Sequence, residues 1–128
     1  MHEIGLMQRM VEVALERAAG AGARHVQRVT VRVGAESGVV PDVIMFAFDV
    51  ATRGTIAEGA VLQIEDVPLA CFCLACDLEF APADALHECP RCHRLGAQVR
   101  RGQEFELASL EIEGSGFRVQ GSEARESS

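Results

Sequence analysis

Four cysteines stand in two pairs with the spacing of a metal site. Cys73 and Cys76 form one C-x2-C pair, Cys89 and Cys92 form a second, and twelve residues separate the two pairs. Each pair can direct two sulfurs at a common point, and four thiolates suit Zn²⁺ because this borderline-soft ion favours tetrahedral sulfur coordination. A site with four protein ligands leaves no open position for a substrate water. The pattern therefore predicts a structural zinc site.

A fifth cysteine, Cys71, precedes the first pair and creates a C-x-C-x2-C sequence. This sequence leaves open whether Cys71 or Cys73 is the ligand. The symmetric pairing of two C-x2-C motifs favours Cys73, so we expect Cys71 to be a spare thiol that behaves as a small, partly buried apolar residue.

A second group with metal chemistry stands at the start of the chain, which reads Met1-His2-Glu3. A histidine at position 2 can offer its imidazole and its own backbone nitrogen in one chelate ring. Such nitrogen donors suit a square-planar Ni²⁺ or Cu²⁺ ion. Without further context, a histidine at this position is read as a solvated terminal residue.

The segments around these residues have the periodicity of regular structure. Apolar residues at spacings of three and four predict an amphipathic helix over 4–18, and Pro41 opens a second apolar segment that predicts a helix over 41–52. Alternation of apolar and polar residues predicts strands over 26–33 and 60–67, and 104–113 is also strand-like.

Together these elements predict an α+β fold with an insertion. Residues 1–68 plus 104–113 are expected to form one unit of two helices on a roughly three-stranded sheet. The cysteine pairs fall in an inserted zinc-ribbon (rubredoxin-like) module over 69–103, which must draw on the metal for stability. Residues 114–128 are rich in Gly, Ser, Glu and Arg, a composition that predicts a disordered tail.

The charge and composition exclude several classes of function. The formal net charge of −7 argues against a nucleic-acid partner, because neutralising phosphates requires a surplus of Lys and Arg on one face. No signal peptide or membrane span is recognised, so we expect a cytoplasmic protein, in which cysteines are metal ligands or free thiols rather than disulfides. We expect no enzymatic activity, because no H-E-x-x-H, G-x-S-x-G or phosphate-binding glycine loop is present.

Several segments together resemble the hydrogenase maturation factor family HypA/HybF, over about residues 1–113. The segments that carry this resemblance are Met1-His2-Glu3-Ile4, Val29-Thr30-Val31-Arg32-Val33-Gly34, Phe46-Ala47-Phe48, Cys71-Phe72-Cys73-Leu74-Ala75-Cys76 and Cys89-Pro90-Arg91-Cys92-His93. The combination of the Met-His-Glu start with paired cysteine motifs at this spacing is specific.

The resemblance implies a nickel metallochaperone that delivers Ni(II) to the large subunit of nickel-iron hydrogenase together with a HypB-type GTPase. Some members of the family also serve urease, so urease maturation proteins are further expected partners. In the family the nickel site is built on the N-terminal Met-His-Glu, which here falls on His2 and Glu3. The zinc is structural, and the fold is a nickel-binding α/β unit with an inserted zinc ribbon.

One departure from the family leaves the remaining nickel ligands open. Several members carry an acidic residue soon after the glycine that ends the first strand, whereas Val40 lies in this region here and cannot coordinate a metal. The further ligand could be Glu36, Asp42, His93 or water. A competing function is a zinc-ribbon scaffold that never binds transient metal, and the Met1-His2-Glu3 start distinguishes the two because only delivery requires it.

Overall fold

The structure is a computed structural model that describes residues 2–113 and 118–120. The chain divides into two compact units. Unit 1 comprises Met1–Arg32, Val39–Glu65 and Phe105–Ser128, and unit 2 comprises Val33–Gly38 and Asp66–Glu104. The two helices belong to unit 1, and all five cysteines belong to unit 2.

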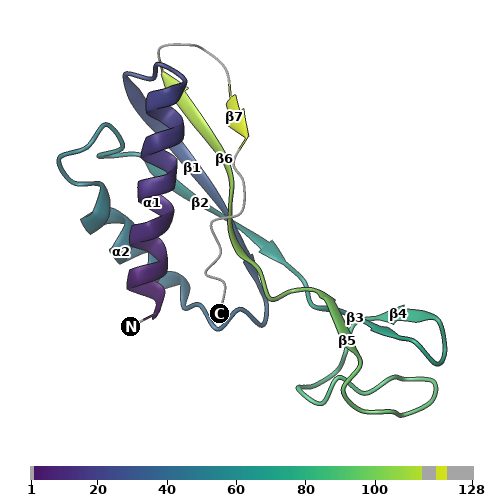
Figure 1. The fold of residues 1–128 in the computed structure, drawn as a ribbon. Helices are drawn as coiled ribbons and strands as arrows, with labels where there is room; N and C mark the ends of the chain where they lie inside the picture. Colours follow the sequence, from purple (N-terminus) through teal and green to yellow (C-terminus); the bar gives the residue numbers. More distant parts are fainter. Residues whose placement is uncertain (1, 114–117, 121–128) are drawn as a thin grey trace. The chain divides into compact units, whose positions relative to one another are not determined.

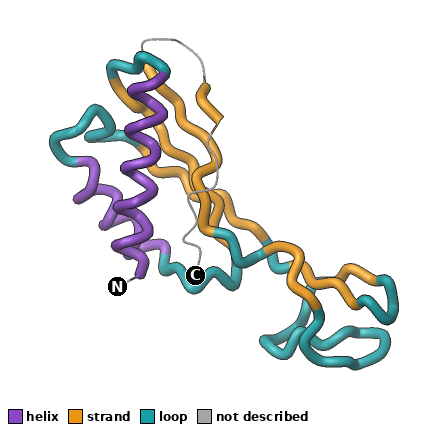
Figure 2. The backbone as a smooth tube through the Cα atoms, in the orientation of Figure 1, coloured by secondary structure: helices purple, strands orange, loops and turns teal. Residues whose placement is uncertain are grey.

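Unit 1 contains two helices and the four-stranded sheet of the molecule, whose strand order is β2-β1-β6-β7. Figures 1 and 2 show both helices on the same face of this sheet. The helices are α1 (His2–Gly20) and α2 (Pro41–Thr52), and the strands are β1 (His25–Gly34), β2 (Val61–Val67), β6 (Phe105–Glu113) and β7 (Arg118–Gln120). The predicted α+β class is confirmed.

The predicted elements agree closely with the observed ones. The helix over 41–52 is confirmed, the first helix is two residues longer at each end, and the three strands differ from their predicted bounds by at most one residue. The fourth strand, β7, was not predicted, because it lies in the segment that was expected to be a disordered tail. The other residues of that segment lie outside the described part of the chain.

The core of unit 1 buries only some of the apolar residues of each helix. Met10 of α1 is only 1% exposed, whereas Ile4 of the same helix is 44% exposed. On α2, the apolar residues Phe46 and Val50 are 63% and 43% exposed. Because α2 has apolar residues on nearly every side, periodicity alone does not fix the buried face. The buried residues of α2 are Ile44, Ala47, Phe48 and Thr52.

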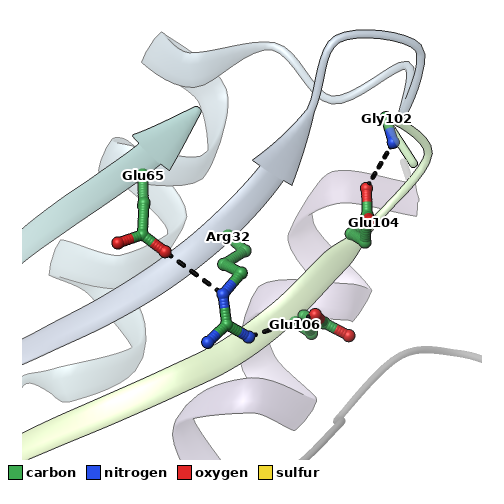
Figure 3. Close-up of polar contacts among 5 residues, drawn as sticks. All are labelled: Arg32, Glu65, Gly102, Glu104 and Glu106. Atoms are coloured by element: carbon green, nitrogen blue, oxygen red, sulfur yellow. Dashed lines mark hydrogen bonds and ion pairs between the residues drawn. The ribbon is translucent and has the colours of Figure 1, made fainter. Parts of the chain in front are cut away.

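Arginines of β1 cross-link the sheet on its polar side. The Arg32 guanidinium donates to Glu65 on β2 at 3.1 Å and to Glu106 on β6 at 3.2 Å, as Figure 3 shows. Arg28 lies four residues earlier in the chain and on the same face of β1, and it also bridges β2 and β6. Thr30 lies between them and is only 6% exposed, so this face is drier than the alternation predicted.

Unit 2 is a small antiparallel sheet with long loops. Its strand order is β4-β3-β5, and loops make up much of this unit in Figure 2. The strands are β3 (Ala70–Cys73), β4 (Leu78–Phe80) and β5 (Gln98–Arg101). Such a unit has too little apolar surface for a conventional core, which makes its cysteines the principal buried side chains.

Backbone hydrogen bonds within unit 2 join the end of β1 and the residues after it to the segment around Gly102. The amide of Gly34 donates to the carbonyl of Glu104 at 2.7 Å, and the amide of Glu36 donates to the carbonyl of Gly102 at 2.6 Å. A carboxylate oxygen of Glu104 in turn accepts a hydrogen bond from the Gly102 amide at 2.7 Å, which is also drawn in Figure 3. These bonds make the segment part of unit 2.

Candidate metal centre

The sulfurs of Cys73, Cys76, Cys89 and Cys92 converge on one point of unit 2. All four lie within 4.8 Å of one another, and the sulfurs of Cys73 and Cys92 are 3.7 Å apart. A tetrahedral site with metal–sulfur bonds of about 2.3 Å has sulfur–sulfur edges of about 3.8 Å. The donor set and its spacing therefore fit a four-thiolate site for an ion such as zinc.

Each cysteine pair is followed by a residue whose backbone is left-handed. Asp77 follows Cys76 with φ of 51°, and His93 follows Cys92 with φ of 65°. This conformation turns the chain tightly after each pair, so that both sulfurs of the pair face the same point. Asp and His tolerate positive φ better than most residues with a Cβ atom, although glycine does so at lower cost.

Backbone hydrogen bonds close the second turn around Cys89. Its amide donates to the carbonyl of Arg94 at 2.9 Å, and the amide of His93 donates to the carbonyl of Cys89 at 2.9 Å. The amide of Arg91 also donates to the Cys89 sulfur at 3.4 Å. Backbone hydrogen bonds therefore fix the position of this sulfur and favour its thiolate form.

The thiols of Cys76 and Cys89 differ in pKa because their surroundings differ. Backbone N–H groups, that of Cys92 before that of Arg91, lower the pKa of the Cys89 thiol to about 6. Burial, followed by hydrogen bonds with neighbouring sulfurs, raises the pKa of the Cys76 thiol to about 12. Gathering four thiolates at one point is unfavourable without a cation, whereas a bound metal ion keeps a coordinating thiol deprotonated.

Cys71 lies apart from this group. It is fully buried in β3, where it faces Phe80 of β4 and Val99 of β5 in the sheet register. Burial, and to a lesser extent the Glu36 carboxylate, raises the pKa of its thiol, so it stays protonated. The structure therefore brings the sulfur of Cys73, rather than that of Cys71, into the four-cysteine group.

The structure describes only some of the side chains that the sequence proposes as nickel ligands. His2 opens α1, but the side chains of His2 and Glu3 lie outside the described part of the structure. Of the further candidates, Asp42 is exposed in the first turn of α2. His93 contacts the Glu88 carboxylate through Nδ1 at 2.7 Å. Among side chains described between residues 4 and 113, the cysteine group is the only cluster of three or more metal-binding residues.

Glu36, another candidate for a further nickel ligand, is paired with a histidine of unit 2. Its carboxylate pairs with Nε2 of His87 at 2.8 Å, and the side-chain amide of Gln103 donates to the same group at 3.4 Å. The hydrogen bond from His87 is the largest cause that lowers the pKa of Glu36 from its ordinary value of 4.5. No local sequence pattern predicts this pair, because 51 positions separate the two residues.

Among the helices of the described segments, none is both long and apolar enough to cross a membrane.

Comparison with known proteins places the site in a functional context. Residues 1–112 match the family model described as hydrogenase/urease nickel incorporation, metallochaperone, hypA. Two similar relatives are both hydrogenase maturation factors HypA. The one from a Picosynechococcus species is 44% identical over 112 residues, which cover 88% of this chain and 99% of the relative. The one from a Roseiflexus species is 46% identical over 114 residues, which cover 88% and 93%.

Solved structures give the same result. The solution structure of the Ni metallochaperone HypA from Helicobacter pylori aligns with a TM-score of 0.65 at 25% identity, covering 86% of this chain and 96% of that chain. A second solution structure of a HypA protein aligns with a TM-score of 0.69 at 27% identity, covering 88% and 96%. The match to the family model and the identity to these relatives show that this chain belongs to the HypA family of hydrogenase and urease nickel-incorporation metallochaperones.

Proposed function

We propose that this chain binds Ni(II) through His2 and Glu3 and delivers it for the maturation of nickel-iron hydrogenase. The observation that carries the proposal is the family match, which spans residues 1–112 and therefore includes the Met1-His2-Glu3 start. The imidazole and backbone nitrogens at this position supply the donors that Ni²⁺ prefers. Among the described residues, α1 begins at His2, so a fixed element follows the site directly.

The second part of the proposal assigns the four-cysteine centre to structural zinc. Cys73, Cys76, Cys89 and Cys92 would each contribute one thiolate, and the closed coordination sphere suits a folding role rather than catalysis. Zinc bound there would hold the turns of unit 2 together, since few other side chains of this unit are buried. A reducing cytoplasm would keep these four thiols free of disulfides and available to the metal.

The proposed partners follow from the delivery of nickel. A HypB-type GTPase and the hydrogenase large subunit are the expected partners for hydrogenase, and urease maturation proteins are candidates because the matched family description names both enzymes. We propose no catalytic role for the chain itself, since the function assigned to its relatives is maturation of another protein.

Isothermal titration of Ni(II) into zinc-loaded protein with a native, tag-free N-terminus tests the proposal. We expect a single nickel site that is lost in His2→Ala and weakens below about pH 6, as the imidazole protonates near its reference pKa. His25→Ala is the matched control, because His25 contacts only the Glu58 carbonyl among its described polar partners and lies at the start of β1. Zinc content should be the same in all three proteins.

The same variants separate delivery from scaffolding in cells grown at low nickel. His2→Ala should abolish hydrogenase maturation, and excess nickel should restore part of it, whereas His25→Ala should mature the enzyme normally. A scaffold would behave differently, because His2→Ala would then support maturation at every nickel concentration. Unchanged nickel binding together with normal maturation in His2→Ala would reject the delivery function.

A further inference from the structure

We propose that the second cysteine turn and β5 form a docking surface for an acidic segment of a partner protein, with an apolar side chain of that segment seated between Leu74 and Leu95. We call this surface the basic ribbon face, and it comprises Phe72, Leu74, Arg91, Arg94, Leu95 and Arg100. The inference concerns protein recognition and is independent of nickel binding.

The charge of the basic ribbon face is opposite to that of the whole chain. Between Pro90 and Gln103 the sequence contains four arginines and no Asp or Glu, although the chain as a whole carries a formal charge of −7. All four arginines are exposed. Among the ion pairs between described residues, only Arg101 of these four takes part, through Glu79. The other three, Arg91, Arg94 and Arg100, are available to a partner's carboxylates.

An apolar cavity lies beside these charges. It has a volume of about 360 Å³, and its lining includes Phe72, Leu74, Arg94 and Leu95. Leu74 and Leu95 are 78% and 61% exposed, which is costly for two large aliphatic side chains unless a partner covers them. The cavity is large enough for an aliphatic side chain, and Arg94 places a positive charge on its wall.

The floor of the cavity is held in place by the sheet. Phe72 of β3 is paired with Gln98 of β5, and both residues line the cavity. Arg100, two residues further along the same face of β5, stacks its guanidinium over the Phe72 ring at 4.2 Å from the centroid. The arginine is thereby fixed at the cavity edge, so less side-chain entropy is lost when it binds a carboxylate.

These features favour an acidic peptide over a nucleic acid. Among the six residues of the basic ribbon face the only aromatic ring is Phe72, and Arg100 already covers one face of this ring, whereas single-stranded nucleic acids are bound by stacking bases on free aromatic rings. A long polyanion would also meet the acidic residues of the same unit, such as Asp77, Asp84 and Glu88. A short acidic segment with one apolar residue engages the arginines and the cavity without meeting them.

Fluorescence anisotropy on the zinc-loaded, nickel-free full chain tests the docking surface. The probe is a labelled peptide of about ten residues that alternates leucine and glutamate, and a peptide that alternates leucine and lysine is its control. We expect the acidic peptide alone to bind, with an affinity that falls as salt is raised from about 50 to about 300 mM because the charges are exposed.

Matched variants locate the binding. Arg94→Glu should weaken the acidic peptide about tenfold, whereas Arg24→Glu, an equal charge change at an exposed site in unit 1, should leave it unchanged. Leu95→Ser should also weaken it, whereas Leu86→Ser, at a leucine that is 56% exposed in the same unit and does not line the cavity, should not. Zinc content is measured in each variant to show that unit 2 has folded.

Three results would overturn the proposal. In the first, the acidic peptide does not bind, or it binds Arg94→Glu and Arg24→Glu equally. In the second, a single-stranded oligothymidine binds where the peptide does not, which would assign the basic ribbon face to nucleic acid. In the third, sedimentation shows a dimer that Arg94→Glu dissociates, which would make a second copy of the chain the occupant. Because nickel is absent throughout, none of these results bears on nickel delivery.

Discussion

At the scale of single residues, the conformation of the backbone after each cysteine pair is as important as the sulfurs themselves. Asp77 and His93 both adopt positive φ, where a Cβ atom is strained and glycine is not. His93→Gly should therefore stabilise unit 2 by about 0.5–1 kcal/mol, and His93→Val should destabilise it by about 1–2 kcal/mol because a β-branched residue fits this region worst.

Competition with a chelator for zinc, measured at several chelator concentrations, reports this difference. Asp77→Gly and Asp77→Val provide an independent repeat of the same comparison at the first pair. Equal zinc retention in the glycine and valine variants would mean that the left-handed turns do not limit the stability of the site.

Substitution of the cysteines should show that four of them are needed to retain zinc and that the fifth, Cys71, is not. Cys73→Ala should cost several kcal/mol of local stability and release the zinc, because the module derives its folding energy from the metal. Cys71→Ala should keep one zinc per chain, since this thiol is buried in the sheet away from the other sulfurs. Elemental analysis of both proteins checks the prediction, and equal zinc loss would contradict it.

The pair between Glu36 and His87 should be visible in the titration of Glu36. The hydrogen bond from His87 lowers the pKa of Glu36 in the folded protein, so its contribution to stability is present above about pH 4.5 and is lost as pH falls through the lowered pKa. In His87→Ala the pKa of Glu36 should rise toward 4.5, as measured by carboxyl-carbon NMR. An unchanged pKa would mean that the surrounding backbone, rather than His87, sets the charge of Glu36.

At the scale of elements, the connection within unit 2 between the end of β1 and the segment after β5 depends on a close approach of two backbone segments. A Cβ atom on Gly34 would lie 2.2 Å from the carbonyl carbon of Gly102, which is backbone and cannot move aside as a side chain could. Gly34→Ala should therefore destabilise this connection by about 3 kcal/mol, the upper end of the range for overpacking.

Gly5→Ala is the matched control for this substitution. Gly5 lies within α1, where an added Cβ meets no atom within 4 Å, so alanine should stabilise the helix by about 1 kcal/mol. Denaturant unfolding of both variants shows whether the signs are opposite. A harmless Gly34→Ala would mean that the hydrogen bonds from residues 34 and 36 tolerate a wider separation of the two segments.

The order and bounds of the elements were predictable because the apolar residues of each element recur with the period of a helix or a strand within its own segment. The burial of α2 was not, since Phe46 and Ile44 are both apolar and only tertiary packing decides between them. The fourth strand β7 was missed because its segment has the composition of a tail, and its pairing with β6 is a long-range property. The convergence of the four cysteine sulfurs follows from a spacing that is visible in the local sequence, whereas the pairing of Glu36 with His87 is fixed only by the fold.

At the scale of the whole molecule, the two units derive their stability from different sources. The buried apolar residues of unit 1 come from both helices and the sheet, with Met7, Met10, Ile44, Leu107 and Leu110 all at or below 1% exposure. Burial of that much apolar surface sustains a fold without cofactors. In unit 2 the buried side chains include Cys71, Cys73 and Cys89, so a metal bound by its convergent sulfurs, as proposed, would be the main source of its stability.

Removal of zinc from the intact chain should therefore unfold one unit and spare the other. With a strong chelator at neutral pH, amide hydrogen exchange should accelerate across residues 66–104, while the helical circular dichroism signal, which comes from α1 and α2, should remain nearly unchanged. Cys73→Ala is the internal control, because it should show the rapid exchange before the chelator is added and no further change afterwards. Readdition of zinc should restore slow exchange in the wild-type chain only. If the helical signal collapsed together with unit 2, the core of unit 1 would depend on the metal, and the two units would fold as one.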